Sequence, residues 1–499
     1  MDFIRNFPLF NIILAFISVV LCSLFKRKAA RITTIIINLI SVAVGVCVLI
    51  LTLNVGSIEY QMGHFTAPFC NEIRFGVLEA LFATFFPLII LFSILGGVTR
   101  IEKDIDEKKE HFIYVLLNLV LVALIALIYT NDVFTGYVFL EISTLASIGL
   151  IMIKDKGNTP VAAIRYMVFN LMGSALFLLG IIFLYDLTGY LSMSYIKTSV
   201  TTLIQESKNV PAIIGSFLLV TIGLGIKSGM FPFYFWMPDA YGESTTTSAS
   251  IVSGVISKGY IILLIKMIYR TFGWDNISSL KLTNVLLVVG ILGMIFGSIS
   301  AIRQDKINRM ISFSSAAQIG YIFMGIGLGP AGMVGAVVQI LCHACTKPLL
   351  FVSSSKLIEA SNGSQTFKQL RGSGKRNLMA GLGYTIGSLS MVGFPLFAGF
   401  ITKYTLIFGA LQANIDTLQL AFAIVALVIS TLLNTIYFLR TIITIYAPKE
   451  VFETKNNDYV PTHCNRFNIS IIGFSIINII IGVLPLIIDL IKTGLDMLS

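Results

Sequence analysis

Apolar runs long enough to cross a lipid bilayer recur along almost the whole chain, and they restrict its fold more than any other feature. A helix needs about 20 consecutive apolar residues to span the hydrocarbon core of a bilayer. Hydrophobic residues make up 56% of the 499 residues and charged residues only 12%, roughly half the charged fraction of a soluble protein. The sequence therefore predicts an all-α polytopic membrane protein.

These runs predict about 14 transmembrane helices. We expect their centres near residues 15, 43, 88, 121, 143, 174, 220, 258, 292, 320, 344, 393, 430 and 480. The first run (about 7–25) has too long an apolar core for a removable signal peptide, so we expect it to be retained. The longest stretches between helices precede the third helix or cover 189–210 and 359–377. None is long enough for a soluble domain, so we expect no cofactor, and redox or ATP-driven chemistry must belong to another subunit.

The basic residues indicate how the chain is oriented. They gather in the links that join an odd-numbered helix to the next even-numbered one, such as KRKAAR, RIEKDIDEKKEH and RQDKINR. Positive residues stay on the cytoplasmic side, so both termini should lie outside. The net charge of +10 then reflects topology and contact with anionic lipid, and it does not indicate a nucleic-acid partner.

Ionisable residues interrupt the apolar runs where lipid would not tolerate them. A charge at the bilayer centre costs at least about 2.5–3.5 kcal/mol, so such residues are normally paired, hydrated and functional. The positions that we single out as a proton path are Glu141, Lys227, Lys258, His343, Lys347 and Lys403. Lys266 lies nearer the outer end of its helix, and we expect it to extend to the interface.

A single buried lysine is often a structural salt bridge between helices. Here four lysines accompany one carboxylate, so simple pairing leaves most of them without an opposite charge. Loss of water favours the neutral amine, so such lysines can exchange protons. Asn170 and Ser174 on the sixth helix either hydrate this path or support packing. Asp239 and Glu243 either help proton entry or lie in a solvated loop, and the loop is the favoured interpretation.

Two Phe-Pro pairs occur inside apolar segments, in GIKSGMFPF around Pro232 and in MVGFPLFAGFITK around Pro395. Proline removes a helix hydrogen bond and clashes with the preceding turn, so each segment should be a broken helix. Paired broken helices in a transporter indicate its ion path. The alternative is an ordinary helix end at each pair.

Two other signals are weak. The six cysteines are scattered mainly in or beside apolar segments, which indicates small buried residues and no disulfide framework. Cys342 and Cys345 have CxxC spacing, but no second pair follows, so we expect no metal site. Residues 327–332 match GxGxxG without a preceding strand, which does not favour a dinucleotide site.

The chain resembles the antiporter-like subunits of complex I, of the Mrp cation/proton antiporters and of membrane-bound hydrogenases. The resemblance covers roughly residues 60–410 and rests on segments such as TNDVFTGYVFLEIST, GIKSGMFPFYFWMPDAYGE, SGVISKGY, HACTKPLLF and GFPLFAGFITKY. It implies fourteen helices with two inverted five-helix repeats and broken helices 7 and 12. The implied division is 1–111 (helices 1–3), 112–270 (first repeat), 271–447 (second repeat) and 448–499 (helix 14).

The resemblance also implies roles for the buried residues. Glu141 matches the family's helix 5 glutamate and Lys227 its helix 7 partner. Lys258 matches the central helix 8 lysine, His343 and Lys347 the helix 11 connection, and Lys403 the terminal helix 12 lysine. Two departures are STTTSAS, which replaces a proline-containing stretch before helix 8, and RFGVLEAL, which lacks an aspartate common at the start of helix 3.

We therefore expect a proton-translocating subunit of a redox-driven complex of the membrane-bound hydrogenase or complex I type, not catalytic by itself. The alternative is the D-type subunit of an Mrp-type Na⁺/H⁺ antiporter. Lysines suit protons better than sodium, because hard cations prefer oxygen ligands. Expected partners are homologous membrane subunits, a peripheral redox arm and the lipid of the cell membrane. Two further hypotheses are a structural anchor for a redox arm and a self-sufficient transporter of an organic solute.

Overall fold

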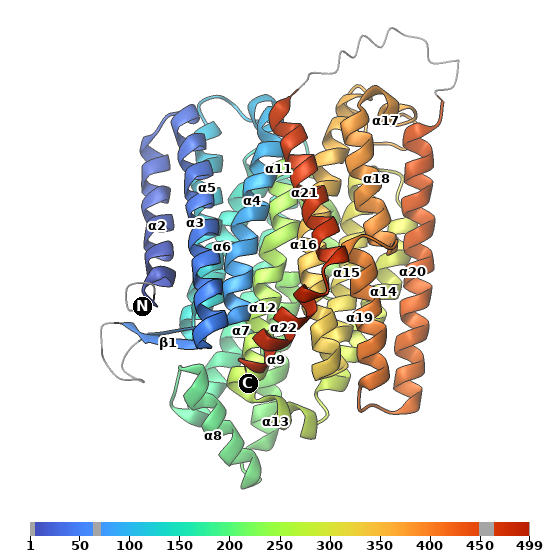
Figure 1. Ribbon diagram of the computed structural model, residues 1–499. Coiled ribbons are helices and arrows are strands. Elements are labelled where there is room, and N and C mark those ends of the chain that lie inside the picture. Colours follow the sequence, from blue (N-terminus) through green and yellow to red (C-terminus); the bar gives the residue numbers. More distant parts are fainter. Residues whose placement is uncertain (1–4, 63–70, 449–463, 499) are drawn as a thin grey trace.

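The computed structural model describes residues 5–62, 71–448 and 464–498 and is nearly all helical (Figure 1). Within these ranges, 13 helices are long and apolar enough to cross a membrane. They are α2 (Phe7–Leu24), α3 (Arg27–Val55), α4 (Val77–Asp104), α5 (Glu110–Tyr129), α6 (Val133–Met152), α7 (Thr159–Thr188), α9 (Val210–Ser228), the composite span Thr246–Phe272, α14 (Thr283–Ile302), α15 (Ile307–Gly327), α16 (Pro330–Glu359), α20 (Thr417–Tyr446) and α21 (Asn465–Val483).

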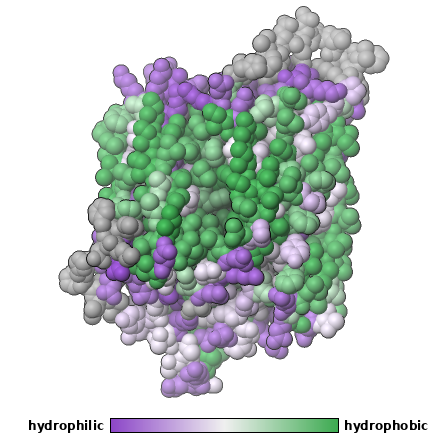
Figure 2. Space-filling view, in the orientation of Figure 1, coloured by the Kyte–Doolittle hydropathy of each residue, from purple (hydrophilic) through white to green (hydrophobic). Residues whose placement is uncertain are grey.

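A shorter apolar helix, α18 (Leu378–Val392), precedes α19 (Ala398–Gln412). Together with the 13 spans, this pair accounts for every expected helix centre. The centre expected near 393 falls on the interruption between α18 and α19. The predicted all-α polytopic architecture is confirmed, and Figure 2 shows the apolar belt between two polar rims that such a protein requires.

The interior of the bundle is formed by the span 246–272 together with α15 and α16, whose most apolar windows are almost entirely buried. The span 246–272 consists of α11 (Thr246–Ile251), a π-helix η3 (Val252–Ile256), α12 (Ser257–Met267) and a second π-helix η4 (Ile268–Phe272). Peripheral helices instead expose apolar side chains such as Leu145 and Ile443. The STTTSAS segment begins this span, where the Thr245 hydroxyl accepts a hydrogen bond from the Ser248 amide and so caps α11.

Helical structure stops before both Phe-Pro pairs. Helix α9 ends at Gly229 (φ +82°), and α18 ends at Gly393 (φ +91°). A left-handed φ of this kind favours glycine at a helix end. Pro232 and Pro395 are both exposed. The first interruption is followed by η2 (Tyr234–Trp236) and α10 (Met237–Glu243), and the second by α19. The assignment of broken helices to two inverted repeats stays a prediction.

The structure adds elements that the apolar runs did not predict. A small antiparallel hairpin pairs β1 (Ile58–Gln61) with β2 (Glu72–Phe75). The link 189–210, one of the longest stretches expected between transmembrane helices, contains α8 (Met193–Gln205). Short helices α13 (Trp274–Ser279) and α17 (Ser373–Arg376) cap opposite faces of the bundle in Figure 1. After α21 the chain turns into α22 (Leu486–Asp496), which packs against α4 and α16. We call the face with α8 and α13 the α8/α13 face.

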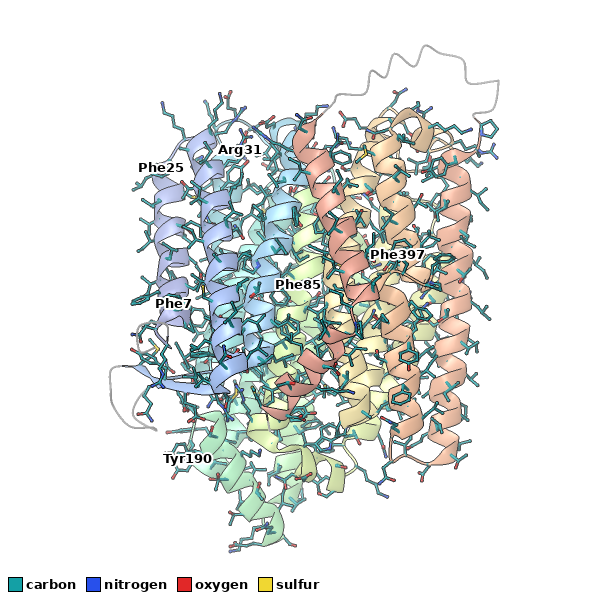
Figure 3. All side chains as sticks on the ribbon, in the orientation of Figure 1. Phe7, Phe25, Arg31, Phe85, Tyr190 and Phe397 are labelled. Atoms are coloured by element: carbon teal, nitrogen blue, oxygen red, sulfur yellow. The ribbon has the colours of Figure 1, made fainter. Side chains whose placement is uncertain are left out.

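The chain enters the bundle from the α8/α13 face. Figure 3 shows Phe7 nearer that face and Phe25 at the opposite end of α2. Arg31, near the same end as Phe25, pairs with Glu102 at 2.7 Å. Because successive spans alternate in direction, the links rich in basic residues gather at the end opposite the α8/α13 face.

Candidate functional site

The first two residues of the predicted proton path are in direct contact. Lys227 Nζ lies 3.1 Å from Oε1 of Glu141 and donates a 2.7 Å hydrogen bond to the Thr144 hydroxyl. Ser174 of α7 donates a hydrogen bond to the same Glu141 oxygen, whereas the Asn170 side chain donates to the Tyr166 carbonyl of its own helix. The Lys227 side chain is fully buried, and 22% of the Glu141 side chain is exposed.

Tyr260 of α12 (Ser257–Met267) extends this contact to the helix that carries the next lysine. Its hydroxyl lies 3.4 Å from Thr144 Oγ1 and 3.2 Å from Ser143 Oγ. Lys227 Nζ lies 5.7 Å from the centre of the Tyr260 ring, within the range of a cation–π interaction. Tyr260 follows Lys258 by two residues in α12. Tyr260 is not among the residues predicted from the sequence, because side chains two positions apart on a helix do not face each other.

Lys258 is fully buried and is bound by oxygens of its own helix. Its ammonium donates to the Ser253 carbonyl and, at 3.0 Å, to Ser257 Oγ. Ser253 belongs to the π-helix η3, and single π-turns inside α-helices are frequent at functional sites. Gly254 allows close packing here, because a Cβ at this position would lie 2.6 Å from Cγ of Pro348 in α16.

Lys347 and His343 lie on α16, next to this π-turn. Lys347 Nζ donates to the Ile311 carbonyl at 3.0 Å and to the Ser314 hydroxyl, both on α15. His343 is fully buried, and neither ring nitrogen has a hydrogen-bond partner among the described residues. Both side chains are within electrostatic range of Lys258. The structure therefore brings these three predicted residues together.

Lys403 lies at the interruption between α18 and α19. Its ammonium donates to the carbonyls of Met391 (3.3 Å) and Val392, at the end of α18. The last carbonyls of a helix have no intrahelical partner, and the negative end of the helix dipole attracts a cation. Cys342 of α16 is within electrostatic range of this ammonium. Cys342 is also within electrostatic range of Lys347, and this shared neighbour is what connects the two lysines.

Most lysines in the row of predicted proton-path residues, from Glu141 to Lys403, have no carboxylate partner among the described residues. Across the described ranges, none of the ion pairs includes Lys258, Lys347 or Lys403. Each of these ammonium groups is instead bound by carbonyl or hydroxyl oxygens. Such ligands accept hydrogen bonds from both the charged ammonium and the neutral amine. The arrangement can therefore hold each lysine in either protonation state.

A second polar network beside Lys347 was missed from the sequence. Ser430, Asn434 and Tyr437 of α20 are buried, and the Tyr321 hydroxyl donates 3.0 Å to Ser430 Oγ while it accepts 3.3 Å from the Asn434 amide. Tyr437 donates to Asn434 and interacts with Ser314. The positions 430, 434, 437 and 441 recur every three or four residues, so their shared helical face was a usable signal.

Asn478 of α21 fastens the second interruption to the core. Its Nδ2 donates 2.7 Å to Thr346 Oγ1, and its Oδ1 accepts 3.2 Å from the Ala398 amide. This amide belongs to the first residue of α19, where a helix has no internal partner for its N–H groups. Sequence reasoning gave this asparagine no role.

Two expectations about charged residues are wrong. Lys266 does not extend to the interface but is fully buried, with Nζ donating to the Ile128 and Thr130 carbonyls, because the open end of α5 supplies those acceptors. Asp239 and Glu243 are not in a solvated loop: both lie in α10, and Asp239 pairs with Arg165 and Arg309.

Glu79 of α4 forms a buried ion pair of 2.8 Å with Arg270. Glu79 lies in RFGVLEAL, one of the two segments that differ from the family pattern. Neither residue is among those predicted from the sequence, since Arg270 lies at the end of an apolar run.

The cysteines behave as small side chains. Cys22, Cys342 and Cys345 are buried, and Cys22, Cys47, Cys342, Cys345 and Cys464 carry free thiols; Cys70 lies outside the described residues. No group of three or more histidine, cysteine or acidic residues suited to a metal ion occurs in the part of the chain that the structure describes.

Comparison with known proteins places the site in a family. The sequence model described as "NADH:quinone oxidoreductase/Mrp antiporter, TM" matches residues 130–430, which include all six predicted path residues. NADH-quinone oxidoreductase subunit N of Desulforudis audaxviator is 32% identical over 68% of this chain and 66% of its own length, just under two thirds. The D-type subunit of the Na(+)/H(+) antiporter of Alkalihalophilus pseudofirmus is 29% identical over 70% and 69%, respectively.

Two solved structures have the same fold. The membrane-bound sulfane sulfur reductase, an archaeal respiratory membrane complex, contains a chain with a TM-score of 0.85 and 24% identity, covering 100% of this chain and 98% of that one. The Mrp complex from Dietzia sp. DQ12-45-1b contains one with a TM-score of 0.86 and 21% identity, covering 99% and 97%. At these identities the likeness shows the fold alone.

Proposed function

Because the chain belongs to the NADH:quinone oxidoreductase/Mrp antiporter transmembrane family, we propose that it translocates protons as a membrane subunit of a multisubunit redox-driven complex. The complex is of the complex I or membrane-bound hydrogenase type, and the energy source lies outside this chain. The chain is not catalytic by itself. Its function is to move charge along the buried row from Glu141 to Lys403.

One observation supports this proposal most strongly: buried lysines without carboxylate partners. Lys258 and Lys347 are fully buried, and within the described part of the chain their ammonium groups are bound only by neutral oxygens. The two ammonium groups are within electrostatic range of each other, and two cations in a medium of low dielectric constant repel each other. Protonation of one therefore favours release of a proton by the other. A structural ion pair, by contrast, needs an acidic partner.

Transfer along the row begins at the Glu141–Lys227 pair. When the carboxylate is close, it stabilises the protonated lysine, and when it moves away or is neutralised, the proton is released. The Thr144 hydroxyl contacts both Lys227 Nζ and the Tyr260 hydroxyl, and Tyr260 belongs to the same helix as Lys258. Hydroxyl groups both donate and accept hydrogen bonds, so with water they form a conductive path. His343 and Lys347 then connect Lys258 to the interruption that carries Lys403.

The second candidate is the D-type subunit of an Mrp-type Na⁺/H⁺ antiporter, which the likeness to the Alkalihalophilus protein favours. The two candidates differ in the ion that leaves. In a redox-driven proton pump, proton flux in vesicles depends on electron donor and continues without Na⁺. In an antiporter, it depends on a Na⁺ gradient.

We place the protein in the cell membrane with the α8/α13 face and both termini outside. The distribution of basic residues supports this orientation, since positive links stay cytoplasmic. We also propose other membrane subunits as partners, homologous antiporter-like chains among them, and a peripheral redox arm. A tag at either terminus should be digested by protease added outside intact cells. Digestion only after the cells are broken would reverse the orientation.

The test of the function is proton translocation by the intact complex with Lys227→Met. The complex is purified, inserted into vesicles and supplied with its electron donor while a pH-sensitive dye reports flux. We expect at least a tenfold loss. Lys208→Met is the matched control, because Lys208 is an exposed lysine outside the spans, paired with Glu206. Unchanged flux in Lys227→Met would overturn the proposal.

The same vesicles separate the two other hypotheses. A structural anchor predicts that lysines 227, 258 and 403 tolerate alanine together as long as the complex assembles. A self-sufficient solute transporter predicts substrate-dependent uptake by the purified chain alone. The proton-pump account predicts lost flux in the first experiment and no uptake in the second.

A further inference from the structure

A buried charged cluster outside the predicted row lies at the other end of α12. Lys266 is eight residues beyond Lys258, which corresponds to about 12 Å along a helix. Its side chain is fully buried, and its ammonium donates to the carbonyls of Ile128 (2.7 Å) and Thr130. These carbonyls lie at the C-terminal end of α5, where a cation is favourable.

Glu79 and Arg270 complete this cluster. Arg270 Nη2 lies 2.8 Å from Glu79 Oε1, and the two side chains are 1% and 2% exposed. Both are within electrostatic range of Lys266. Arg74 is also within electrostatic range of Lys266, but it pairs with Glu59. Full ionisation of Lys266, Arg270 and Glu79 therefore leaves one excess positive charge among buried side chains. Loss of a proton from Lys266 removes that excess, because the guanidinium of Arg270 does not deprotonate in proteins.

Several polar atoms of the cluster need water. Among the described residues, Nε and Nη1 of Arg270 and the hydroxyl of Tyr129 are buried without a hydrogen-bond partner. Buried polar groups are normally satisfied by protein atoms or by ordered water. Since no protein atom satisfies these three, water molecules within the cluster are their natural partners. Water there can accept a proton from the lysine.

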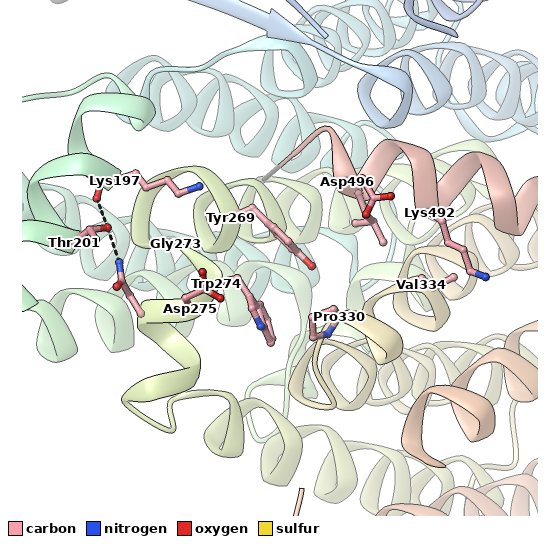
Figure 4. A pocket seen from close by; sticks show the side chains of 12 residues that line it. Lys197, Thr201, Tyr269, Gly273, Trp274, Asp275, Pro330, Val334, Lys492 and Asp496 are labelled. Atoms are coloured by element: carbon pink, nitrogen blue, oxygen red, sulfur yellow. Dashed lines mark hydrogen bonds between the residues drawn. The ribbon is translucent and has the colours of Figure 1, made fainter. Parts of the chain in front are cut away.

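A cavity of about 590 Å³ adjoins the cluster on the α8/α13 face. Its lining includes Lys197, Tyr269, Trp274, Asp275, Lys492 and Asp496, arranged around the opening as Figure 4 shows. Tyr269 is the chain neighbour of Arg270, and Lys197 is within electrostatic range of Arg270. The charged lining suits water, so an aqueous space lies next to the residues that flank Arg270.

We propose that Lys266 is a proton-exchange site that opens past Arg270 and Glu79 to this cavity. In the exchange, one N–H bond of the ammonium breaks, and the proton passes to a water molecule as hydronium. The neutral amine keeps its hydrogen bonds to the two carbonyls. If the row functions as a proton relay, on which this step depends, Lys258 reloads Lys266 through water. The row then has an outlet on the α8/α13 face besides Lys403.

The alternative is a purely structural contact that joins α4, α5 and α12 and exchanges no proton. Arginine distinguishes the two, because it keeps the positive charge and donates to carbonyls but cannot release a proton. A purely structural contact therefore tolerates Lys266→Arg, whereas a proton-exchange site does not. We expect Lys266→Arg to assemble normally, with at least a tenfold loss of redox-driven proton flux in vesicles. Normal flux in the assembled Lys266→Arg complex would overturn the proposal.

Access from the cavity is tested separately, with no dependence on proton flux. Lys266→Cys is made in a chain whose Cys47, Cys70 and Cys464 are serine, and a membrane-impermeant cationic thiol reagent is added to one side of the vesicles. Ile262→Cys, one turn earlier and also buried, is the matched control. We expect modification of Lys266→Cys from the α8/α13 face, at least tenfold faster than the control. Equal rates would overturn the proposed opening even if Lys227→Met abolishes flux.

The two experiments also distinguish this inference from the proposed function. If Lys227→Met leaves flux normal, the relay itself is wrong. If Lys227→Met abolishes flux but Lys266→Arg does not, only the additional outlet is wrong.

Discussion

Lys227 Nζ lies 3.1 Å from Oε1 of Glu141, although the two residues are 86 positions apart in the chain. The pair joins α6 to α9 just before the first helix interruption. Lys227 is fully buried, whereas part of the Glu141 side chain is exposed. A change at the surface that moves or neutralises Glu141 therefore directly weakens the electrostatic stabilisation of the buried Lys227 ammonium. This geometry suits the loading step of a proton relay.

Neutralising Glu141 should weaken this step without unfolding the protein. We expect Glu141→Gln to reduce proton flux by at least tenfold, while assembly is unchanged, because the amide retains the contact with Ser174 but not the charge. Glu59→Gln, a change to an exposed carboxylate in the hairpin, is the control. Normal flux in Glu141→Gln would show that the carboxylate does not load Lys227.

The Glu79–Arg270 pair should matter for stability. Removing one partner of a buried ion pair costs about 3–5 kcal/mol, because the other charge is left uncompensated. We expect Glu79→Gln to lower the thermal unfolding temperature or prevent assembly. Glu59→Gln serves again as control, since its carboxylate pairs with Arg74 at 3.4 Å but is 53% exposed, and exposed pairs contribute about 0–1 kcal/mol. Equal stability of both variants would contradict the buried pairing.

Gly393 should be sensitive to substitution. Its φ of +91° is unfavourable for other residues, and a Cβ would lie 2.8 Å from Cδ of Lys403. We expect Gly393→Ala to cost about 1–3 kcal/mol and to lower proton flux, because Lys403 must move from the carbonyls of α18. Gly215→Ala is the matched control, as a Cβ there meets nothing within 4 Å. Thermal unfolding and flux are measured together, and identical behaviour of the two variants would refute the close approach.

Asn478 should link the interruption between α18 and α19 to α21. Its amide satisfies both the Ala398 N–H and the Thr346 hydroxyl, and a buried group left unpaired costs about 1–3 kcal/mol. We expect Asn478→Leu to lower the unfolding temperature and the flux. Asn54→Leu provides the comparison, because Asn54 is exposed and, among the described residues, its side chain hydrogen-bonds to the Ile50 carbonyl of its own helix. A stable, active Asn478→Leu would show that α21 does not position α19.

Much of the fold follows from the sequence because a membrane helix is specified by its own apolar run. All fourteen expected centres fall within helices or, at 393, on the interruption of one. The extent of α8 and the hairpin could not be predicted in this way, because their structure depends on contacts with other elements. The isolated bridge between Ile73 and Thr130, for example, ties the hairpin to the end of α5.

The site was predicted less completely. Charges in apolar runs are visible in a sequence, so the lysines and Glu141 could be chosen. Lys266 was placed at the interface because its sequence position lies near a helix end, whereas its burial depends on α5 carbonyls that no local pattern reveals. Tyr260, Asn434 and Asn478 are uncharged, and polar residues of this kind are common in membrane helices without a functional role.

Lys258 gives the most direct test of the central claim that buried lysines carry protons through this chain. It is bound by the Ser253 carbonyl and the Ser257 hydroxyl, so its removal breaks no salt bridge and leaves no carboxylate uncompensated. Redox-driven proton flux is measured in vesicles that contain the intact complex with Lys258→Met, beside Lys281→Met, which removes an exposed lysine from a turn. The account predicts that Lys258→Met assembles but loses at least tenfold of its flux, while Lys281→Met is normal. Normal flux in the assembled Lys258→Met complex would contradict it.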